Sequence, residues 1–487
     1  MNRTVFHTIP GSAVLREWRG VALLLVVGIG AGALISRLDL SLALAAACLP
    51  LLLLLAAAMA LRPGVGLLLA LVFSFLAAGM ARYVPLPWGL GVDLILAICV
   101  LGLFFQKFRS PDWALLKNDA ILLAVIWLGY LLLELLNPAA PGPVAWAYAV
   151  RGIGLYNLFV FALAFLYLRH PRCLVLFLKV VLWLSVLGSL WGFRQQFFGL
   201  DAAEHYWIWD EGHHDEHVLH GVLRVFSFYS DAGQFGASQA MIALMCGVLV
   251  LGPFPLRKKA FYSFVAVLAL FGFLFSGSRG ALAVPAAGVL VYLILSKNFK
   301  ILGAGLLAIG LVFYLLKFTF VMHSFQPVAR LRTALSVDNP SLQARLHNQV
   351  TFGNYLKSRP LGGGIGSAGY WGERFRPGSL LAETPTDSYY VKIWAETGLI
   401  GICLHLLMLG YFLGKGSFIV WHIRDPELRY RAMVLLAAFG GVLLASYGNQ
   451  VYSQFPTGII MPIALSMIFM APQYDEQLAR EKKRSGI

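Results

Sequence analysis

Long apolar runs recur from one end of this sequence to the other, and they restrict the fold more than any other feature. A helix rises about 1.5 Å per residue, so about 20 apolar residues cross the roughly 30 Å hydrocarbon layer of a membrane. With 59% hydrophobic residues and a mean hydropathy of +0.75, the chain is not a water-soluble globule. We expect an all-α polytopic membrane protein, a bundle of about 12–14 transmembrane helices. The predicted spans lie near residues 21–36, 40–61, 64–81, 88–105, 119–136, 144–168, 173–193, 232–252, 260–276, 281–296, 300–316, 388–413, 431–447 and 455–471.

Lys and Arg residues cluster between alternate spans, which places the clusters on one side of the membrane. Because basic loops stay in the cytoplasm, this pattern predicts that both termini are cytoplasmic. It also accounts for most of the formal net charge of +15, so that charge does not indicate nucleic-acid binding. The clusters are Arg3/Arg16/Arg19, Lys107/Arg109, Arg169/Arg172, Arg257/Lys258/Lys259, Lys297/Lys300, Arg424/Arg429/Arg431 and Arg480/Lys482/Lys483/Arg484.

Two long polar segments, 194–231 and 317–387, fall on the opposite, external side. Functional groups concentrate on such segments when a rigid bundle holds them, so we expect any chemistry to be external. The chain then divides into N-terminal helices with the first polar segment, central helices, a large external loop between late helices, and C-terminal helices with a basic cytoplasmic tail. The corresponding residues are 1–231, 232–316, 317–387 and 388–487.

One arginine breaks the charge pattern. In FGFLFSGSRGALAVPAAGVLVYL, residues 271–293, Arg279 lies one span away from the basic clusters on either side, and therefore at the external face. A charge facing the bilayer centre costs about 2.5 kcal/mol or more, and less near an interface. Arg279 is either an interfacial or internally paired arginine or part of an anion site. Arg224, an isolated cation at the end of the first polar segment, is predicted to face the same cavity.

The two polar segments differ in character. The first carries His213, His214, His217 and His220 among acidic residues, which is typical of a solvated loop and, less often, of a metal site; we assign no metal site. The second is basic in its middle, which suits an anionic partner or lipid head groups, and Arg345 and Arg359 are its candidate substrate-binding residues. Its LQARLHNQVTFGNYLKSRPLGGGIGS stretch predicts a helix that ends at Arg359-Pro360, followed by a glycine-rich turn.

Three motifs together carry a resemblance. SGSRG is followed by a long external loop with RLHNQ and YLKSRPLGGGIGS, and then by TDSYYVKIWAETGLIG at the start of the next span. In this order, over residues 224–401, the sequence resembles the O-antigen ligase and polymerase superfamily.

This resemblance implies glycan transfer at the periplasmic face of the bacterial inner membrane. A polyprenyl-diphosphate-linked oligosaccharide donates its reducing-end sugar to a hydroxyl of an acceptor glycan, with neither nucleotide nor metal as cofactor. The resemblance makes Arg224 and Arg279 diphosphate-binding residues, a role that suits guanidinium groups because they donate two parallel hydrogen bonds to an oxyanion. Other proteins of polysaccharide assembly and export, and membrane lipids, are the further expected partners.

The sequence departs from the family at one position. Ligases of the family have His-Asn at the start of the segment that leads into the E-T-G-L-I-G helix, and here Asp387 and Ser388 stand at that place. Asp387 is the candidate base that activates the acceptor hydroxyl, or a helix N-cap. Because the histidine is missing, we favour polymerisation of repeat units over ligase-type transfer to a lipid or protein acceptor.

Some predictions near the site have two interpretations. The aromatic residues Tyr389 and Tyr390 either stack on sugar rings of the substrate or belong to an interfacial aromatic belt. Arg151, inside the sixth span, either lines the groove for the donor lipid or pairs with Glu134. A multi-pass lipid or polysaccharide transporter is the alternative from another functional class, although the sequence shows no internal repeat.

Overall fold

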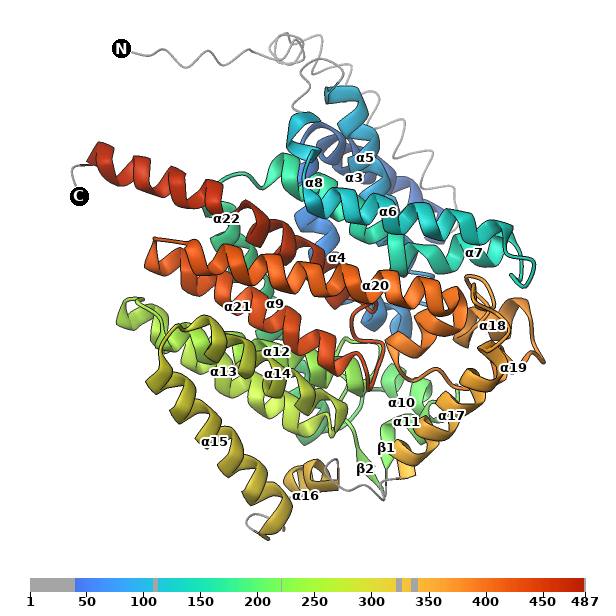
Figure 1. Ribbon diagram of the computed structural model, residues 1–487. Coiled ribbons are helices and arrows are strands. Elements are labelled where there is room, and N and C mark those ends of the chain that lie inside the picture. The colour runs from blue at the N-terminus through green and yellow to red at the C-terminus, as the bar shows by residue number, and fades with distance from the viewer. Residues whose placement is uncertain (1–39, 108–112, 220, 321–325, 334–339, 486–487) are drawn as a thin grey trace.

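The fold is a bundle of long helices with a cap of short helices at one end (Figure 1). The computed structural model describes residues 40–107, 113–219, 221–320, 326–333 and 340–485. The predicted span at 21–36, the first basic cluster and Arg109 lie outside these residues. Every other predicted span coincides with a helix or with a continuous series of helical turns.

The first half of the described chain contains mainly long helices. At the beginning of α6, Asn118 accepts a hydrogen bond from the Ile121 N–H, and the sixth span is divided by the π-helical turn η3. The elements are α3 (Leu40–Leu61), α4 (Pro63–Tyr83), α5 (Gly89–Lys107), η1 (Trp113–Leu116), α6 (Asp119–Leu133), η2 (Glu134–Leu136), α7 (Pro143–Val150), η3 (Arg151–Leu155), α8 (Tyr156–Tyr167), α9 (Pro171–Phe198), α10 (Ala202–Trp209), α11 (His214–His217), β1 (Val218–Leu219) and β2 (Val222–Leu223).

The second half adds the central helices and the second polar segment. Ten helices of the described part are long and apolar enough to cross a membrane, and three shorter apolar helices accompany them. The remaining elements are α12 (Ala232–Leu251), α13 (Leu256–Phe275), η4 (Gly280–Leu282), α14 (Ala283–Leu295), α15 (Phe299–Phe318), α16 (Gln326–Thr333), α17 (Pro340–Leu356), α18 (Gly369–Phe375), α19 (Leu380–Glu383), α20 (Tyr389–His422), α21 (Pro426–Ala445) and α22 (Thr457–Ser485).

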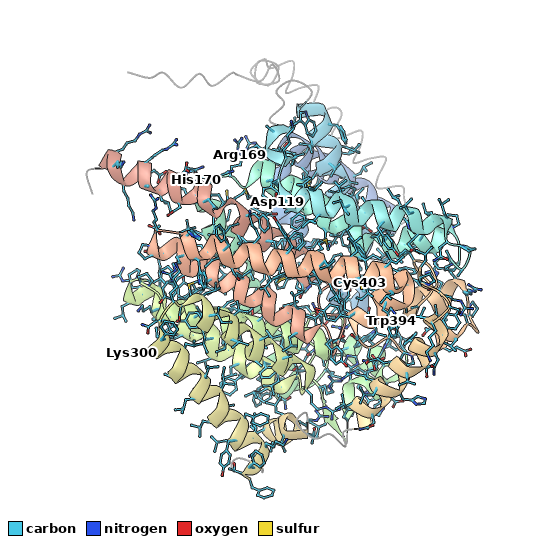
Figure 2. All side chains as sticks on the ribbon, viewed as in Figure 1. Asp119, Arg169, His170, Lys300, Trp394 and Cys403 are labelled. Carbon is cyan, nitrogen blue, oxygen red and sulfur yellow. The ribbon has the colours of Figure 1, made fainter. Side chains whose placement is uncertain are left out.

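The basic clusters of the described residues gather at one end of the bundle, called here the basic end. Arg429 donates to the Leu295 carbonyl at 3.1 Å, Gln477 donates to the Arg169 carbonyl at 3.1 Å, and the Arg431 guanidinium lies 5.2 Å from the Phe254 ring. Figure 2 shows Arg169, His170 and Lys300 on this side, with Trp394 of α20 farther along the bundle. The helices α10, α11, α17, α18 and α19 lie at the other end, called here the loop end (Figure 1).

Helices α12, α21 and α22 form the centre of the bundle, because most of their apolar residues are buried, whereas α15 lies on the outside with no buried residue. The first half of α12, AGQFGASQA, consists largely of small side chains. Small residues let neighbouring helices approach closely, which is how helices pack in membranes. This helix contacts α13, α14 and α21, and it brings its N-terminus into the middle of the loop end.

The glycine-rich turn after α17 is inserted into a break in α20. Gly398 interrupts the helix with φ 65° and ψ −164°, and a Cβ atom there would lie 2.0 Å from the Pro360 carbonyl oxygen. The Gly363 N–H donates to the Ala395 carbonyl at 2.8 Å. Only glycine accommodates both the positive φ and this close backbone approach. The contact fixes the second polar segment against α20.

Candidate functional site

A polar cavity of about 750 Å³ opens at the loop end, where the two polar segments meet the ends of the central helices. Its walls come from seven parts of the chain. These are residues 215–224 of the first polar segment, the start of α12 at 231–233, the SGSRG turn at 277–280, α17, α18, residues 386–387 before α20, and residues 448–454 between α21 and α22.

Arg224 enters the cavity from the first polar segment. The hairpin of β1 and β2 reverses the chain, so that the Arg224 N–H donates to the His217 carbonyl at 2.7 Å. Its guanidinium donates to the carbonyls of Glu216 at 2.8 Å and Ser276 at 3.4 Å. Burial lowers the pKa of Arg224 from its ordinary value, although the charge of Asp231 acts in the opposite direction. Arg224 therefore joins the first polar segment to the SGSRG turn.

Arg279 enters from the SGSRG turn itself. The Ser276 hydroxyl donates to the Phe273 carbonyl at 2.6 Å and accepts from the Ser278 N–H at 3.2 Å, and these bonds shape the turn that ends α13. Arg279 Nη1 donates to the Thr333 hydroxyl of α16 at 3.3 Å. Burial and the neighbouring charge of Arg345 lower the pKa of Arg279.

Asp387 faces Arg345 across the cavity wall. The distance between Asp387 Oδ2 and Arg345 Nε is 3.7 Å, and both side chains are partly exposed to solvent. Exposed ion pairs of this kind contribute about 0–1 kcal/mol to stability, so the attraction between Asp387 and Arg345 is weak. The N-cap position of α20 is occupied by Ser388, so the interpretation of Asp387 as the helix N-cap is wrong.

The sequence did not indicate the amide-rich wall between α21 and α22. Gln450 donates to the Thr386 hydroxyl at 3.2 Å, beside Asp387, and Gln454 donates to Asp231 at 3.3 Å. Asn449 lies close to the start of α12, where a Cβ atom on Gly233 would be 2.3 Å from its side-chain nitrogen. The signal was available in SYGNQVYSQ, a run of polar residues between two apolar spans.

A second missed residue, Arg82, supports the first polar segment. Its guanidinium lies 4.3 Å from the Trp207 ring and 4.4 Å from the Phe226 ring, and it donates to the carbonyls of Ser227, at 2.6 Å, and Tyr229. Cation–π contacts and hydrogen bonds together stabilise a buried guanidinium. The signal was its position: like Arg279, it is a cation at the end of a span on the side away from the basic clusters.

Most carboxylates of the cavity are more exposed than its arginines. Asp215, Glu216, Glu373 and Asp387 are exposed, whereas Asp231 and the side chains of Arg224, Arg279 and Arg345 are half-buried. Charges that are partly removed from water interact more strongly with a ligand than charges that water surrounds. Near the SGSRG turn the cavity therefore presents guanidinium groups to an anion.

Several predicted substrate-binding residues lie away from the cavity. Arg151 pairs with Asp93 of α5 and donates to the Tyr148 carbonyl at 3.0 Å, so the predicted pairing with Glu134 is wrong. Glu134 is instead buried and accepts a hydrogen bond from Asn137 at 2.8 Å. Arg359 lies over the Tyr355 ring at 3.9 Å.

The two tyrosines at the start of α20 are held within the bundle. Tyr389 has an exposed fraction of 0%, its hydroxyl lies 3.0 Å from His405 Nε2, and its ring packs against Tyr452. Tyr390 donates to the Leu443 carbonyl at 2.7 Å. The interpretation of Tyr389 as a sugar-stacking residue is therefore wrong, because its ring offers no accessible face; that of Tyr390 stays a prediction.

The histidine-rich stretch is compact. His213 and His217 both pack against the Trp207 ring, with centroid distances of 4.4 and 4.9 Å. Among the described residues, which omit His220, no group of three or more His, Cys, Asp or Glu side chains is arranged to hold a metal ion. Of the described histidines, His217 lines the cavity, and burial lowers its pKa to about 4, so it is neutral at pH 7.

Parts of this chain are similar in sequence to known proteins. A family model described as O-antigen ligase matches residues 264–406, which contain Arg279, Arg345 and Asp387. An O-antigen polymerase of Salmonella muenchen is 26% identical over 235 residues, which are 46% of this chain and 55% of that relative. Over these regions the chain is similar to proteins of the O-antigen ligase and polymerase superfamily. The family match confirms the resemblance seen in the three motifs, and it runs from α13 through the SGSRG turn and the second polar segment into α20.

Proposed function

We propose that this protein polymerises polysaccharide repeat units at the periplasmic face of a bacterial inner membrane. The observation that carries the proposal is the convergence of Arg224, Arg279 and Asp387 on one cavity, although they come from separate parts of the chain. The relative from Salmonella muenchen, described as an O-antigen polymerase, supports polymerisation. The loop end is then periplasmic and the basic end cytoplasmic, in agreement with the positive-inside rule.

The donor in this proposal is an oligosaccharide on a polyprenyl diphosphate, and the acceptor is a hydroxyl of a second glycan. The hydroxyl oxygen forms a bond to the anomeric carbon of the donor, the bond from that carbon to the phosphate oxygen breaks, and its electron pair stays on the diphosphate. Arg224 and Arg279 stabilise the charge that develops on the departing diphosphate. Fixed donors of this kind need no reorganisation during the reaction.

Asp387 accepts the proton of the attacking hydroxyl. It lies at the edge of the cavity with one oxygen 3.7 Å from Arg345 Nε, so the two charges attract each other without a short hydrogen bond. A carboxylate within reach of the hydroxyl is a suitable general base. Transfer to a lipid or protein acceptor, as in a ligase, uses the same groups and differs only in the second substrate.

The test is the size distribution of glycan in cells that lack the protein, complemented with the wild type, Arg279→Ala or Arg374→Ala. Arg374 is a matched control, because it is an exposed arginine of the second polar segment that contacts Trp371 and Phe375 outside the cavity. We expect single repeats without the protein, long chains with the wild type and Arg374→Ala, and single repeats with Arg279→Ala.

Other outcomes separate the alternatives. Long lipid-linked chains that never reach an acceptor indicate a ligase. Lipid-linked repeats that accumulate on the cytoplasmic side indicate a transporter. A glycan profile that does not depend on the protein, or complete rescue by Arg279→Ala, contradicts the proposed function.

A further inference from the structure

Helix α16 of the second polar segment touches the SGSRG turn at two points. Thr333 accepts the hydrogen bond from Arg279 described above. One turn earlier in α16, the guanidinium of Arg330 lies against Gly277, in the middle of the turn. Arg330 therefore reaches the same turn as Arg279, but from a helix that follows it by about fifty residues.

Gly277 makes room for this arginine. Its φ is +56°, and a Cβ atom at this position would lie 2.6 Å from Arg330 Nη1 and 3.4 Å from Arg330 Cζ. Any other residue would strain the backbone and also displace the guanidinium. Gly277 thus allows the backbone conformation of the SGSRG turn and also leaves room for the guanidinium group of Arg330.

The described residues around Arg330 do not satisfy all of its hydrogen-bond donors. Its Nη2 atom is buried and has no hydrogen-bond partner among the described residues. A buried guanidinium donor without a partner is unfavourable, and such atoms call for an explanation such as a missing ion. The Arg330 Nη2 atom can therefore donate to a group that the described residues do not provide.

Like charges gather around the same turn. Burial and the charge of Arg279 both lower the pKa of Arg330. The pKa of Arg224 is lowered first by burial, and the charges of Arg330 and Arg279 lower it further against the opposing effect of Asp231. The hydrogen-bond partners of the Arg224 side chain are uncharged carbonyls. Three guanidinium groups at one turn repel one another, and a multiply charged anion between them removes that repulsion.

We propose that Arg330 is a third arginine of the anion site, so that Arg224, Arg279 and Arg330 together select a diphosphate over a single phosphate. This inference rests on the proposed function and adds to it the number of phosphate groups that the site recognises. A diphosphate offers two sets of oxygens, and a guanidinium group pairs with one such set through two parallel hydrogen bonds. A site with three guanidinium groups therefore suits two linked phosphates better than one.

The experiment is isothermal titration of the purified full-length protein in lipid nanodiscs, with inorganic pyrophosphate and inorganic phosphate as separate probes. The wild type should bind pyrophosphate more tightly than phosphate. Arg330→Met should weaken pyrophosphate binding about 10- to 100-fold, and phosphate binding by less than about 3-fold, because a hydrogen-bonded charge pair is lost only at the second phosphate. Arg374→Met, which removes a comparable charge away from the turn, should change neither affinity.

A second variant tests the geometry without changing any charge. Gly277→Ala should displace Arg330 and lower the pyrophosphate affinity as Arg330→Met does, and the double variant should lose little more than either single variant. Circular dichroism and thermal unfolding of each variant establish that it is folded.

The outcomes separate this inference from the proposed function. If the wild type prefers pyrophosphate and Arg330→Met retains that preference, the role of Arg330 is refuted while the diphosphate site of Arg224 and Arg279 stands. If the wild type shows no preference for pyrophosphate over phosphate, both the inference and the diphosphate donor of the proposed function are contradicted.

Discussion

Arg82 and Arg224 lie close to the same hairpin, and their surroundings differ in a way that separates structural from ligand-binding arginines. Arg82 lies between two aromatic rings and donates to the carbonyls of Ser227, Tyr229 and Ser230. Arg224 borders the cavity, with polar partners on one side and the open volume on the other. A guanidinium that aromatic rings enclose has little capacity left for a ligand. We therefore assign Arg82 to the support of the first polar segment and Arg224 to the site.

At the residue scale, His217 should make the stability of the protein depend on pH. Burial lowers its pKa in the folded protein to about 4, below the ordinary value of 6.5. Between these values the unfolded chain binds a proton that the folded chain does not, so the folded state loses stability as pH falls from 6.5 towards 4, by up to about 3 kcal/mol. The variant His217→Phe has no ionisable side chain at this position and cannot bind this proton. In thermal unfolding experiments in detergent, the unfolding temperature of the variant should therefore rise relative to that of the wild type as pH falls.

The comparison at pH 7.5 is the control for this prediction. Both side chains are uncharged there, so the difference between variant and wild type reports only how well phenylalanine packs against Trp207 and Phe226. Unfolding temperatures that fall in parallel for the two proteins from pH 7.5 to pH 4.5 would refute a buried neutral His217.

At the scale of elements, the site depends on how short segments are anchored to long helices. Glu204 of α10 receives hydrogen bonds from Trp191, Arg194 and Gln195 of α9. Gln195 in turn accepts from the Ser227 N–H at 2.8 Å, three residues after Arg224. Because buried networks in which every member is bonded are rigid, α9 fixes the position of the first polar segment. The glycine-rich turn at 360–363 fixes the second segment on α20 in a comparable way.

Gly398→Ala tests the anchor of the second polar segment. The added Cβ atom would lie 2.0 Å from the Pro360 carbonyl oxygen and would occupy a residue with positive φ, so the backbone of one partner must move. We expect a loss of about 2 kcal/mol or more in stability, and faster proteolysis between 340 and 387. Gly410→Ala is the matched control: it lies in the same helix, nothing lies within 4 Å of its added Cβ atom, and helix propensity favours alanine there. Equal stability of the two variants would contradict the anchor.

At the scale of the whole molecule, the main feature is that the basic loops and the cavity lie at opposite ends of the bundle. The basic end holds loops rich in Lys and Arg that contact one another, and the loop end holds the cavity. Between them, α12, α21 and α22 form a buried centre that keeps the two ends apart. A reaction at the loop end is thereby separated from the basic end by the full length of the bundle (Figure 1).

Labelling of single cysteines tests the orientation of the bundle. In a protein whose five native cysteines are replaced by alanine, Lys357→Cys lies at the loop end and Lys300→Cys at the basic end, and both positions are exposed. A maleimide that does not cross membranes should label Lys357→Cys in intact spheroplasts, and Lys300→Cys only after permeabilisation, because basic loops stay in the cytoplasm. The reverse pattern would place the cavity in the cytoplasm and contradict the periplasmic reaction.

The sequence by itself determined the helical class, the positions of the long helices and the arginine in the SGSRG turn as a residue in need of an explanation. These follow from local physics: apolar length, charge at the helix ends, and the unfavourable transfer of a charge into lipid. Only the tertiary structure decided that Arg151 pairs with Asp93, that Tyr389 is buried against His405 and Tyr452, and that Arg330 lies on Gly277. Each is a contact between segments distant in the chain, and it depends on the rotation and depth of packed helices, which hydrophobic length and charge pattern do not encode.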